Sequence, residues 1–181
     1  MIKIIVLTMF SAFILLLASC EEKTVVKKQN IDSLDLALAP DQVSNDVEVI
    51  FADSSFTKAI LKADRAEVYS DKAETILEGS LVVEFMSKST GKRVSVLTAN
   101  SAIIDNKTNN MLAKGDVVVV SDSTDTKLQT QVLEWNDETR KIYSTEFVKI
   151  TTPRERIEGY GFESDPHLDN YKIFKVSGVQ R

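Results

Sequence analysis

Cys20 is the only cysteine of the 181-residue chain, and its neighbours predict a reaction for its thiol. Leu17, Ala18 and Ser19 come directly before it. Small residues let a peptidase approach the backbone, and a cysteine thiolate is a nucleophile that can be alkylated to a thioether. These residue types suit peptide-bond cleavage before Cys20 and alkylation of its sulfur. A single cysteine also excludes an intramolecular disulfide and a cysteine-based metal cluster.

The residues before Cys20 follow the order of a secretory signal. Lys3 supplies a positive start, and the run from Ile4 to Leu17 is almost wholly apolar. The run is shorter than the roughly 20 residues that a membrane-spanning helix needs. With its cysteine directly after Leu-Ala-Ser, the segment resembles the bacterial lipobox. We expect a lipoprotein signal over residues 1–19 and a membrane anchor on Cys20. The alternatives are a plain signal with an incidental cysteine and an uncleaved anchor.

The other reactive side chains form no catalytic pattern. His167 is the sole histidine and follows Asp165-Pro166, which favours a turn. The sequence contains no Gly-x-Ser-x-Gly element and no phosphate-binding glycine loop. Asp64, Asp105 and Asp116 fall near expected corners of the chain, where turn chemistry accounts for them. We therefore expect no enzyme, no cofactor and no metal ion.

The charge of the chain argues against nucleic acid as a partner. Removal of the signal takes away Lys3 and leaves 21 basic and 27 acidic residues. Such an acidic chain is a poor ligand for the phosphate backbone. About 160 residues remain after cleavage, which is enough for one domain with a core.

Beyond the signal the chain divides into a polar segment and a long region with strand-like alternation. Residues 20–46 are mostly polar, and we interpret them as the lipidated cysteine with a flexible tether. Over residues 47–181 apolar and polar residues alternate, and turn-forming clusters such as Lys88–Lys92 and Asn136–Thr139 interrupt them. Long amphipathic patterns are absent. The sequence predicts an all-β domain.

An eight-residue pattern recurs in this region. Its copies begin at Leu61, Leu97, Leu128 and Ile157, which are 36, 31 and 29 residues apart. Apolar or small residues occupy positions 1, 3, 6 and 8 of the first three copies, and a second strand follows each copy after a turn. This spacing is typical of stacked repeats.

The pattern also predicts a bend in each strand. Positions one and three alternate as in a strand, but the next inward residue comes three positions later. One extra residue bends a strand as a β-bulge does and returns the apolar side chain to the inner face. We expect hairpins that wrap and stack into a curved double sheet, with an apolar interior and exposed edge strands at both ends.

The hairpin repeat, the lipobox and the closing segment together resemble the LptC family of lipopolysaccharide export, in its lipoprotein form from Bacteroidota-like bacteria. The resemblance covers roughly Val47–Val179. Its most distinctive parts are Leu128–Asn136, Ile142–Ser144 and the Gly-x-Gly-Phe segment Ile157–Asp165. The chain departs from the better-known form because a lipobox replaces an uncleaved membrane helix. An intramembrane contact between an LptC helix and the transporter is therefore not carried over to this chain.

What the resemblance implies is a curved, repeat-built β-jelly-roll of the OstA type that is open along one side. Its interior would hold the acyl chains of lipopolysaccharide. One end would dock on the permeases of an inner-membrane ATP-binding-cassette transporter, and the other would pair with a soluble LptA- or OstA-like bridge protein. The family points to the periplasmic face of the inner membrane. The outer membrane stays an alternative, because the acidic residues after Cys20 can act as a sorting signal.

Two sets of residues are candidates for these contacts. Ordinary core packing demands the same side chains as a lipid groove, and edge lysines also prevent aggregation. Two further roles fit the same residues: another OstA-like assembly or lipid-binding lipoprotein, and a purely structural β-rich lipoprotein. The groove candidates are Leu81, Val83, Phe85, Val117, Val119, Trp135, Phe147 and Phe162, and the partner-edge candidates are Tyr171, Ile173, Phe174 and Val176.

Gly159 and Gly161 flank Tyr160 at the fourth corner. A sharp bend, the close approach of a partner backbone or a local bulge would each explain a glycine there.

Overall fold

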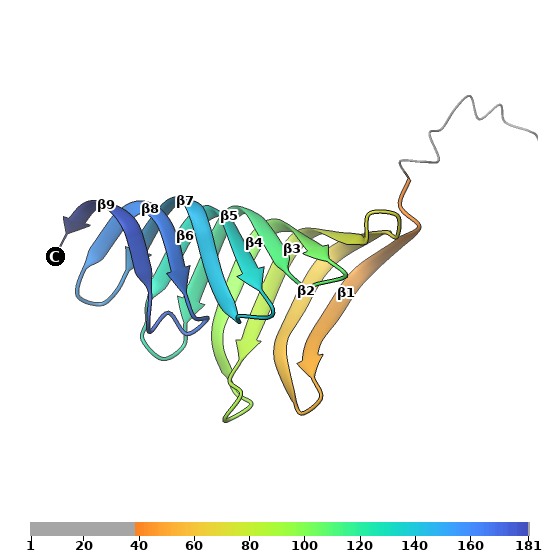
Figure 1. Ribbon diagram of the computed structural model, residues 1–181, viewed down its shortest axis with the longest axis horizontal. Helices are drawn as coiled ribbons and strands as arrows, with labels where there is room; N and C mark the ends of the chain where they lie inside the picture. Colours follow the sequence, from red (N-terminus) through yellow and green to blue (C-terminus); the bar gives the residue numbers. More distant parts are fainter. Residues whose placement is uncertain (1–38, 181) are drawn as a thin grey trace, which may run out of the picture. The chain divides into compact units, whose positions relative to one another are not determined.

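The structure is a computed structural model that describes residues 39–180, and these residues form one antiparallel sheet of nine strands in sequential order (Figure 1). The described residues contain no helix, which confirms the all-β prediction, and thus none that could cross a membrane. Cys20 and the predicted signal lie outside the described residues. The strands are β1 Gln42–Asp53, β2 Phe56–Tyr69, β3 Glu74–Met86, β4 Arg93–Asp105, β5 Met111–Ser121, β6 Lys127–Asn136, β7 Lys141–Thr151, β8 Arg156–Ser164 and β9 Lys172–Gln180. β1 thus begins before the predicted boundary at Val47.

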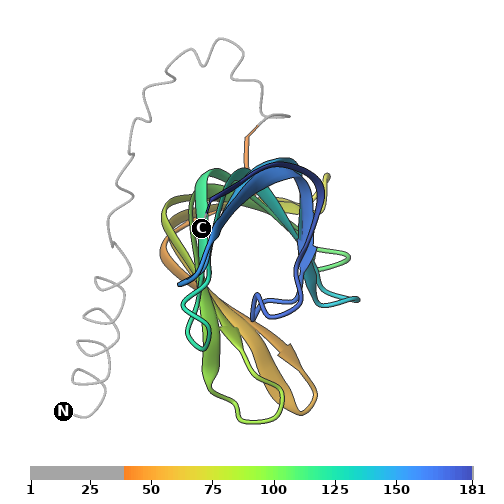
Figure 2. The ribbon, with the colours of Figure 1, turned by 90° about the vertical axis from the view of Figure 1, so that its left-hand side faces the viewer.

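The strands bend near their middles, so that the sheet curves around an interior (Figure 2). The register of neighbouring strands shifts at each bend, for example between Lys62 and Arg65 of β2 and between Lys114 and Val117 of β5. Each bent strand therefore contributes to two layers that face each other. The predicted double sheet is thus a single continuous sheet folded along a line of bulges.

Burial follows the repeat pattern along this line. Positions one, three, six and eight of the second and third copies are all buried, and those of the first and fourth copies are buried or partly buried. The small residues Ala63 and Ala99 occupy the third position, at the corner. The predicted bend after position three is confirmed.

The partner strands turn the corner with paired left-handed residues. Gly79 and Ser80 of β3 have φ of 73° and 36°, and Gly115 and Asp116 of β5 have φ of 77° and 46°. Glycine adopts positive φ without steric cost, so it stands first in each pair. Two such residues in succession form a β-bulge, whose extra residue changes the direction of the strand.

The turns between strands gather at the two margins of the folded sheet. The first rim consists of the turns at 54–55, 87–92, 122–126 and 152–155, and the second rim consists of those at 70–73, 106–110, 137–140 and 165–171. The line along which the two rims approach each other is called the seam below.

Candidate functional site

The interior between the two layers contains seven of the eight predicted groove residues. Phe85, Trp135 and Phe162 contribute the aromatic side chains, and each is at most 4% exposed. The others are Leu81, Val83, Val117 and Val119. They pack in one core with residues from both layers, including Leu61, Leu128 and Ile150. Side chains therefore fill most of the interior.

Phe147 does not belong to this interior, contrary to the prediction. It is 41% exposed and pairs edge-on with Tyr160, at 5.3 Å between ring centroids. The inward residues of β7 are Ile142, Ser144, Val148 and Ile150. The alignment of the third repeat is thus displaced by one residue, and a one-residue slip in a strand moves every side chain to the other face.

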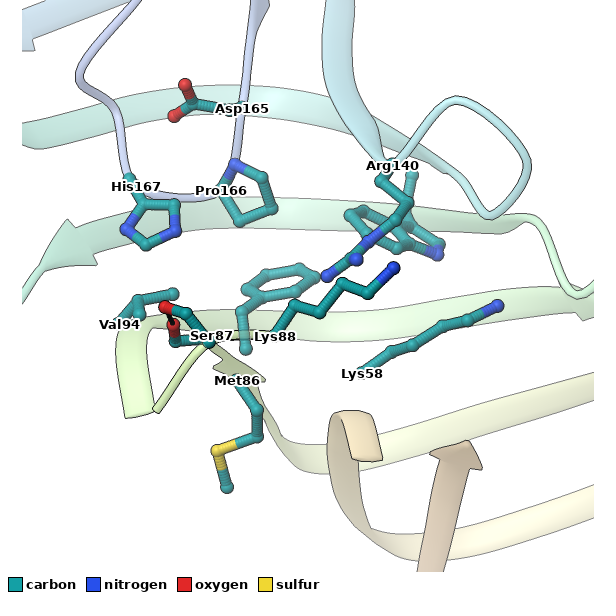
Figure 3. A pocket seen from close by; sticks show the side chains of 12 residues that line it. Lys58, Met86, Ser87, Lys88, Val94, Arg140, Asp165, Pro166 and His167 are labelled. Atoms are coloured by element: carbon teal, nitrogen blue, oxygen red, sulfur yellow. Dashed lines mark hydrogen bonds between the residues drawn. The ribbon is translucent and has the colours of Figure 1, made fainter. Parts of the chain in front are cut away.

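An open cavity of about 470 Å³ lies at the seam, with residues of both rims around it (Figure 3). This volume falls in the range of roughly 300–1,000 Å³ typical of ligand sites. Met86, Lys88 and Val94 come from the first rim and its strands. Arg140, Pro166 and His167 come from the second rim.

Two aromatic rings form the inner wall of the cavity. Phe85 of β3 and Trp135 of β6 both line it, and their ring centroids are 5.1 Å apart with a tilt of 41°. Tilted aromatic pairs are stabilising beyond the area they bury. β3 and β6 are not neighbours in the sheet, so this contact joins the two layers.

Cationic side chains border the same cavity. Lys58 donates a hydrogen bond to Asp137 at 2.7 Å, which makes a salt bridge between β2 and the second rim. Lys88 Nζ and Arg140 Cζ lie 5.5 and 4.9 Å from the ring centroid of Phe56, at cation–π distances. An apolar wall with cations at its margin suits a ligand that has an apolar chain and an anionic end.

Asp165 is the carboxylate that lines this cavity. Its oxygens accept hydrogen bonds from the side chain of Asn170 at 3.1 Å and from the backbone N–H of Asp169 at 3.4 Å. The carboxylate of Asp165 is therefore hydrogen-bonded to residues of its own turn. The sequence did not single out Lys58, Lys88 or Arg140, because nothing in the chain order says that the turns after β3 and β6 meet across the seam.

The predicted partner edge is the last strand of the sheet. β9 pairs with β8 along one side, and no described strand pairs with its other side. Phe174 and Val176 are 64% and 56% exposed, whereas Tyr171 and Ile173 pack partly against the core. Burial raises the pKa of the Tyr171 hydroxyl, with a smaller contribution from the charge of Glu155. β1 is the other edge of the sheet.

The fold has a counterpart among solved structures. It is similar to the crystal structure of LptH, the LptA homologous periplasmic component of the conserved lipopolysaccharide transport device from Pseudomonas aeruginosa. The TM-score is 0.51 at 16% sequence identity, and the similarity covers 65% of this chain and 82% of that one. At this identity the similarity establishes the fold alone. No curated protein matches the chain.

The sequence itself matches a family. Residues 4–176 match the family described as "Lipopolysaccharide-assembly, LptC-related", so the match spans nearly the whole chain and contains every strand from β1 to β8. The chain therefore belongs to the LptC-related family of lipopolysaccharide assembly.

Proposed function

We propose that this chain is the membrane-anchored periplasmic component of lipopolysaccharide export. It receives lipid at an inner-membrane ATP-binding-cassette transporter and passes it to a soluble bridge protein of LptA-like fold. Its family is one of transport and not of catalysis. The observation that carries the proposal is the seam cavity with its Phe85–Trp135 wall, which offers an apolar chain a contact surface at the opening between the two layers.

The lipid path in this proposal starts at the cavity and continues inward. Phe85 and Trp135 make the first contacts, since they line both the cavity and the core. Val83, Val119 and Phe162 lie deeper, where the core is filled. An acyl chain reaches these residues only if the two layers move apart at the seam. Transfer is then coupled to opening of the folded sheet.

Anchoring in this proposal depends on the segment before β1. Residues 1–19 are the signal, Cys20 carries the lipid, and the residues between Cys20 and Gln42, where β1 begins, act as a tether. We place the anchor in the periplasmic face of the inner membrane, with the outer membrane as the alternative. Because a tether only keeps the domain near the membrane, docking on the transporter permeases has to come from the β-sheet itself.

The two free edges of the sheet are the proposed partner contacts. An unpaired strand can bind another strand through backbone hydrogen bonds. β9 is the proposed edge for the soluble bridge protein, and its exposed Phe174 and Val176 would give side-chain contacts. The other free edge, β1, is then the proposed contact with the transporter permeases.

Site-specific photo-crosslinking tests the lipid path in the intact, membrane-anchored protein. Crosslinkers at Phe85 and Trp135 are expected to capture lipopolysaccharide, and a crosslinker at the outer-face residue Phe147 is expected to capture none. The proposal is wrong if Phe147 reacts while Phe85 and Trp135 do not. Co-purification of transporter permeases, rather than outer-membrane partners, separates export from another OstA-like assembly role.

The closely packed interior favours one other function, that of a structural lipoprotein with a solid core. Leu81, Val117 and Phe162 are at most 1% exposed. In that case none of the inward crosslinkers captures lipid, and the cavity at the seam stays empty in the cell.

A further inference from the structure

The seam cavity carries an excess of positive charge. Lys58, Lys88 and Arg140 line it together with a single carboxylate, Asp165. Asp165 is held by its own turn, and Lys58 is neutralised by Asp137. Lys88 and Arg140 therefore supply the charge of the cavity that no salt bridge compensates, although Lys88 also interacts with the charge of the Asp53 carboxylate.

These two cations converge from opposite rims. Lys88 belongs to the turn at 87–92 and Arg140 to the turn at 137–140. Because both contact the ring of Phe56, they lie within about 10 Å of each other. Neither forms a salt bridge with any residue that the structure describes. Two cations outside any salt bridge, at this spacing and beside an apolar wall, are complementary to one multivalent anion with an apolar chain.

We propose that Lys88 and Arg140 bind a phosphate group of the transported lipid while an acyl chain of the same molecule lies against Phe85 and Trp135. This inference rests on the proposed function and adds to it the orientation of the lipid. A guanidinium group presents paired N–H donors that match phosphate oxygens, and a lysine ammonium adds a point charge. The aromatic ring of Phe56 orients both cations before the ligand arrives.

A phosphate bound in this way would also act on the seam. It would contact the first rim through Lys88 and the second rim through Arg140, so that the lipid itself joins the rims. The polar end of the lipid would stay at the seam while its acyl chain points between the layers. Each lipid would then enter the sheet in the same orientation.

The test compares two probes on the full-length lipidated protein in non-ionic detergent: lipopolysaccharide, and the same material after enzymatic removal of its phosphates. In the double variant Lys88→Gln/Arg140→Gln, affinity for the phosphorylated probe is expected to fall roughly tenfold or more, since a charged hydrogen bond is lost at each position. Affinity for the dephosphorylated probe is expected to be the same in the variant and in the unmodified protein.

Two further variants control for charge and folding. Lys92→Gln/Lys107→Gln removes one exposed lysine from each rim outside the cavity, and we expect it to bind both probes normally. Lys88→Arg/Arg140→Lys keeps both charges and is expected to retain most of the affinity. An equal loss in the Lys92/Lys107 variant would mean that general charge, and not the cavity, attracts the lipid, and it would overturn the inference.

The remaining outcomes separate this inference from the proposed function. If the unmodified protein binds both probes equally and crosslinks to lipid at Phe85, the export role stands and the phosphate site is wrong. If it binds neither probe, both proposals fail. Inorganic phosphate alone is expected to compete only weakly. The inference is overturned if millimolar phosphate displaces the lipid fully and binds as tightly as the lipid does. That result would identify a site for free phosphate.

Discussion

The ammonium group of Lys58 lies 2.7 Å from Oδ2 of Asp137, although 79 residues separate the two in the sequence. β2 and β6 are not neighbours in the sheet, so this salt bridge crosses the seam. Its side chains are only 15% and 14% exposed. Water screens such a pair less than a surface pair. The other carboxylate oxygen of Asp137 is buried and has no hydrogen-bond partner among the described residues.

Loss of the Lys58 charge is expected to destabilise the domain. In Lys58→Met the carboxylate of Asp137 stays largely buried without its partner, which costs about 2 kcal/mol of unfolding free energy. Urea unfolding of the mature protein measures this difference. The matched control is Lys62→Met on the same strand. Lys62 pairs with Glu48 at 3.4 Å, with 58% and 52% of the side chains exposed, and should lose less than about 1 kcal/mol. Equal losses would contradict a seam-spanning role for Lys58.

The two faces of the sheet are distinguished by two phenylalanines. Phe162→Ala removes a fully buried ring and is expected to cost about 3–5 kcal/mol. Phe147→Ala removes a ring of the same size from the outer face, where the ring is 41% exposed and pairs with Tyr160, and should cost about 1 kcal/mol. Thermal or urea unfolding of both variants gives the comparison. A larger loss at Phe147 would show that β7 has the register that the sequence alignment predicted.

Much of the fold could be predicted because the repeat indicates which side chains of each strand point inward and where the strand bends. In Leu128–Trp135 the inward residues Leu128, Thr130, Leu133 and Trp135 fall at the expected positions. The predicted alignment of the third partner strand was wrong because Ser144 and Thr145 are polar and give no apolar signal at the corner. Phe147 was therefore aligned in place of Val148. Polar inward residues such as Ser144 weaken any prediction that depends on alternation.

The seam cavity could not be predicted from the sequence. Lys88 and Arg140 occupy turns, where charged residues are normal and carry no signal. Their proximity depends on how far each strand bends and how far the sheet twists between β3 and β6, and neither quantity can be obtained from residue order. The same holds for Lys58 and Asp137. Phe85 and Trp135 were correctly assigned to the interior, but nothing indicated that they face each other.

Gly159 sets how closely β9 packs on β8. A Cβ atom at this position would lie 2.3 Å from the carbonyl oxygen of Lys175 and 2.7 Å from Cγ2 of Ile173. Gly159→Ala therefore forces the backbone of β9 outward, and we expect a loss of about 1–3 kcal/mol. Hydrogen exchange should be faster in β9 than in the unmodified protein. Gly178→Ala is the control on β9, since a Cβ there meets no atom within 4 Å. Similar effects of both variants would contradict this packing role.

Acid stability should depend in part on Asp105. Its carboxylate accepts the backbone N–H groups of Lys107 and Thr108 at 2.8 and 3.1 Å, and these bonds hold its pKa below the usual 3.8. A lowered pKa in the folded state contributes stability above pH 3.8, and this contribution is lost as the pH falls through the folded value. Asp105→Asn should therefore be less stable than the unmodified protein at neutral pH, with a difference that shrinks below pH 3.8. A difference independent of pH would exclude this origin.

Anchoring should depend on Cys20 alone. Cys20→Ser removes the only thiol of the chain, so no thioether lipid can form and the roughly 0.8 kcal/mol per buried CH₂ of each acyl chain is lost. We expect the variant to appear in the soluble fraction and to lose incorporation of a labelled fatty acid. Its β-sheet should unfold at the same urea concentration as that of the unmodified protein, because Cys20 lies outside the sheet that the structure describes. Insertion of ten residues into the tether, by contrast, should leave membrane attachment and lipid crosslinking at Phe85 intact. Loss of crosslinking after that insertion would mean that the anchor positions the domain on the transporter, and it would contradict docking through the sheet itself.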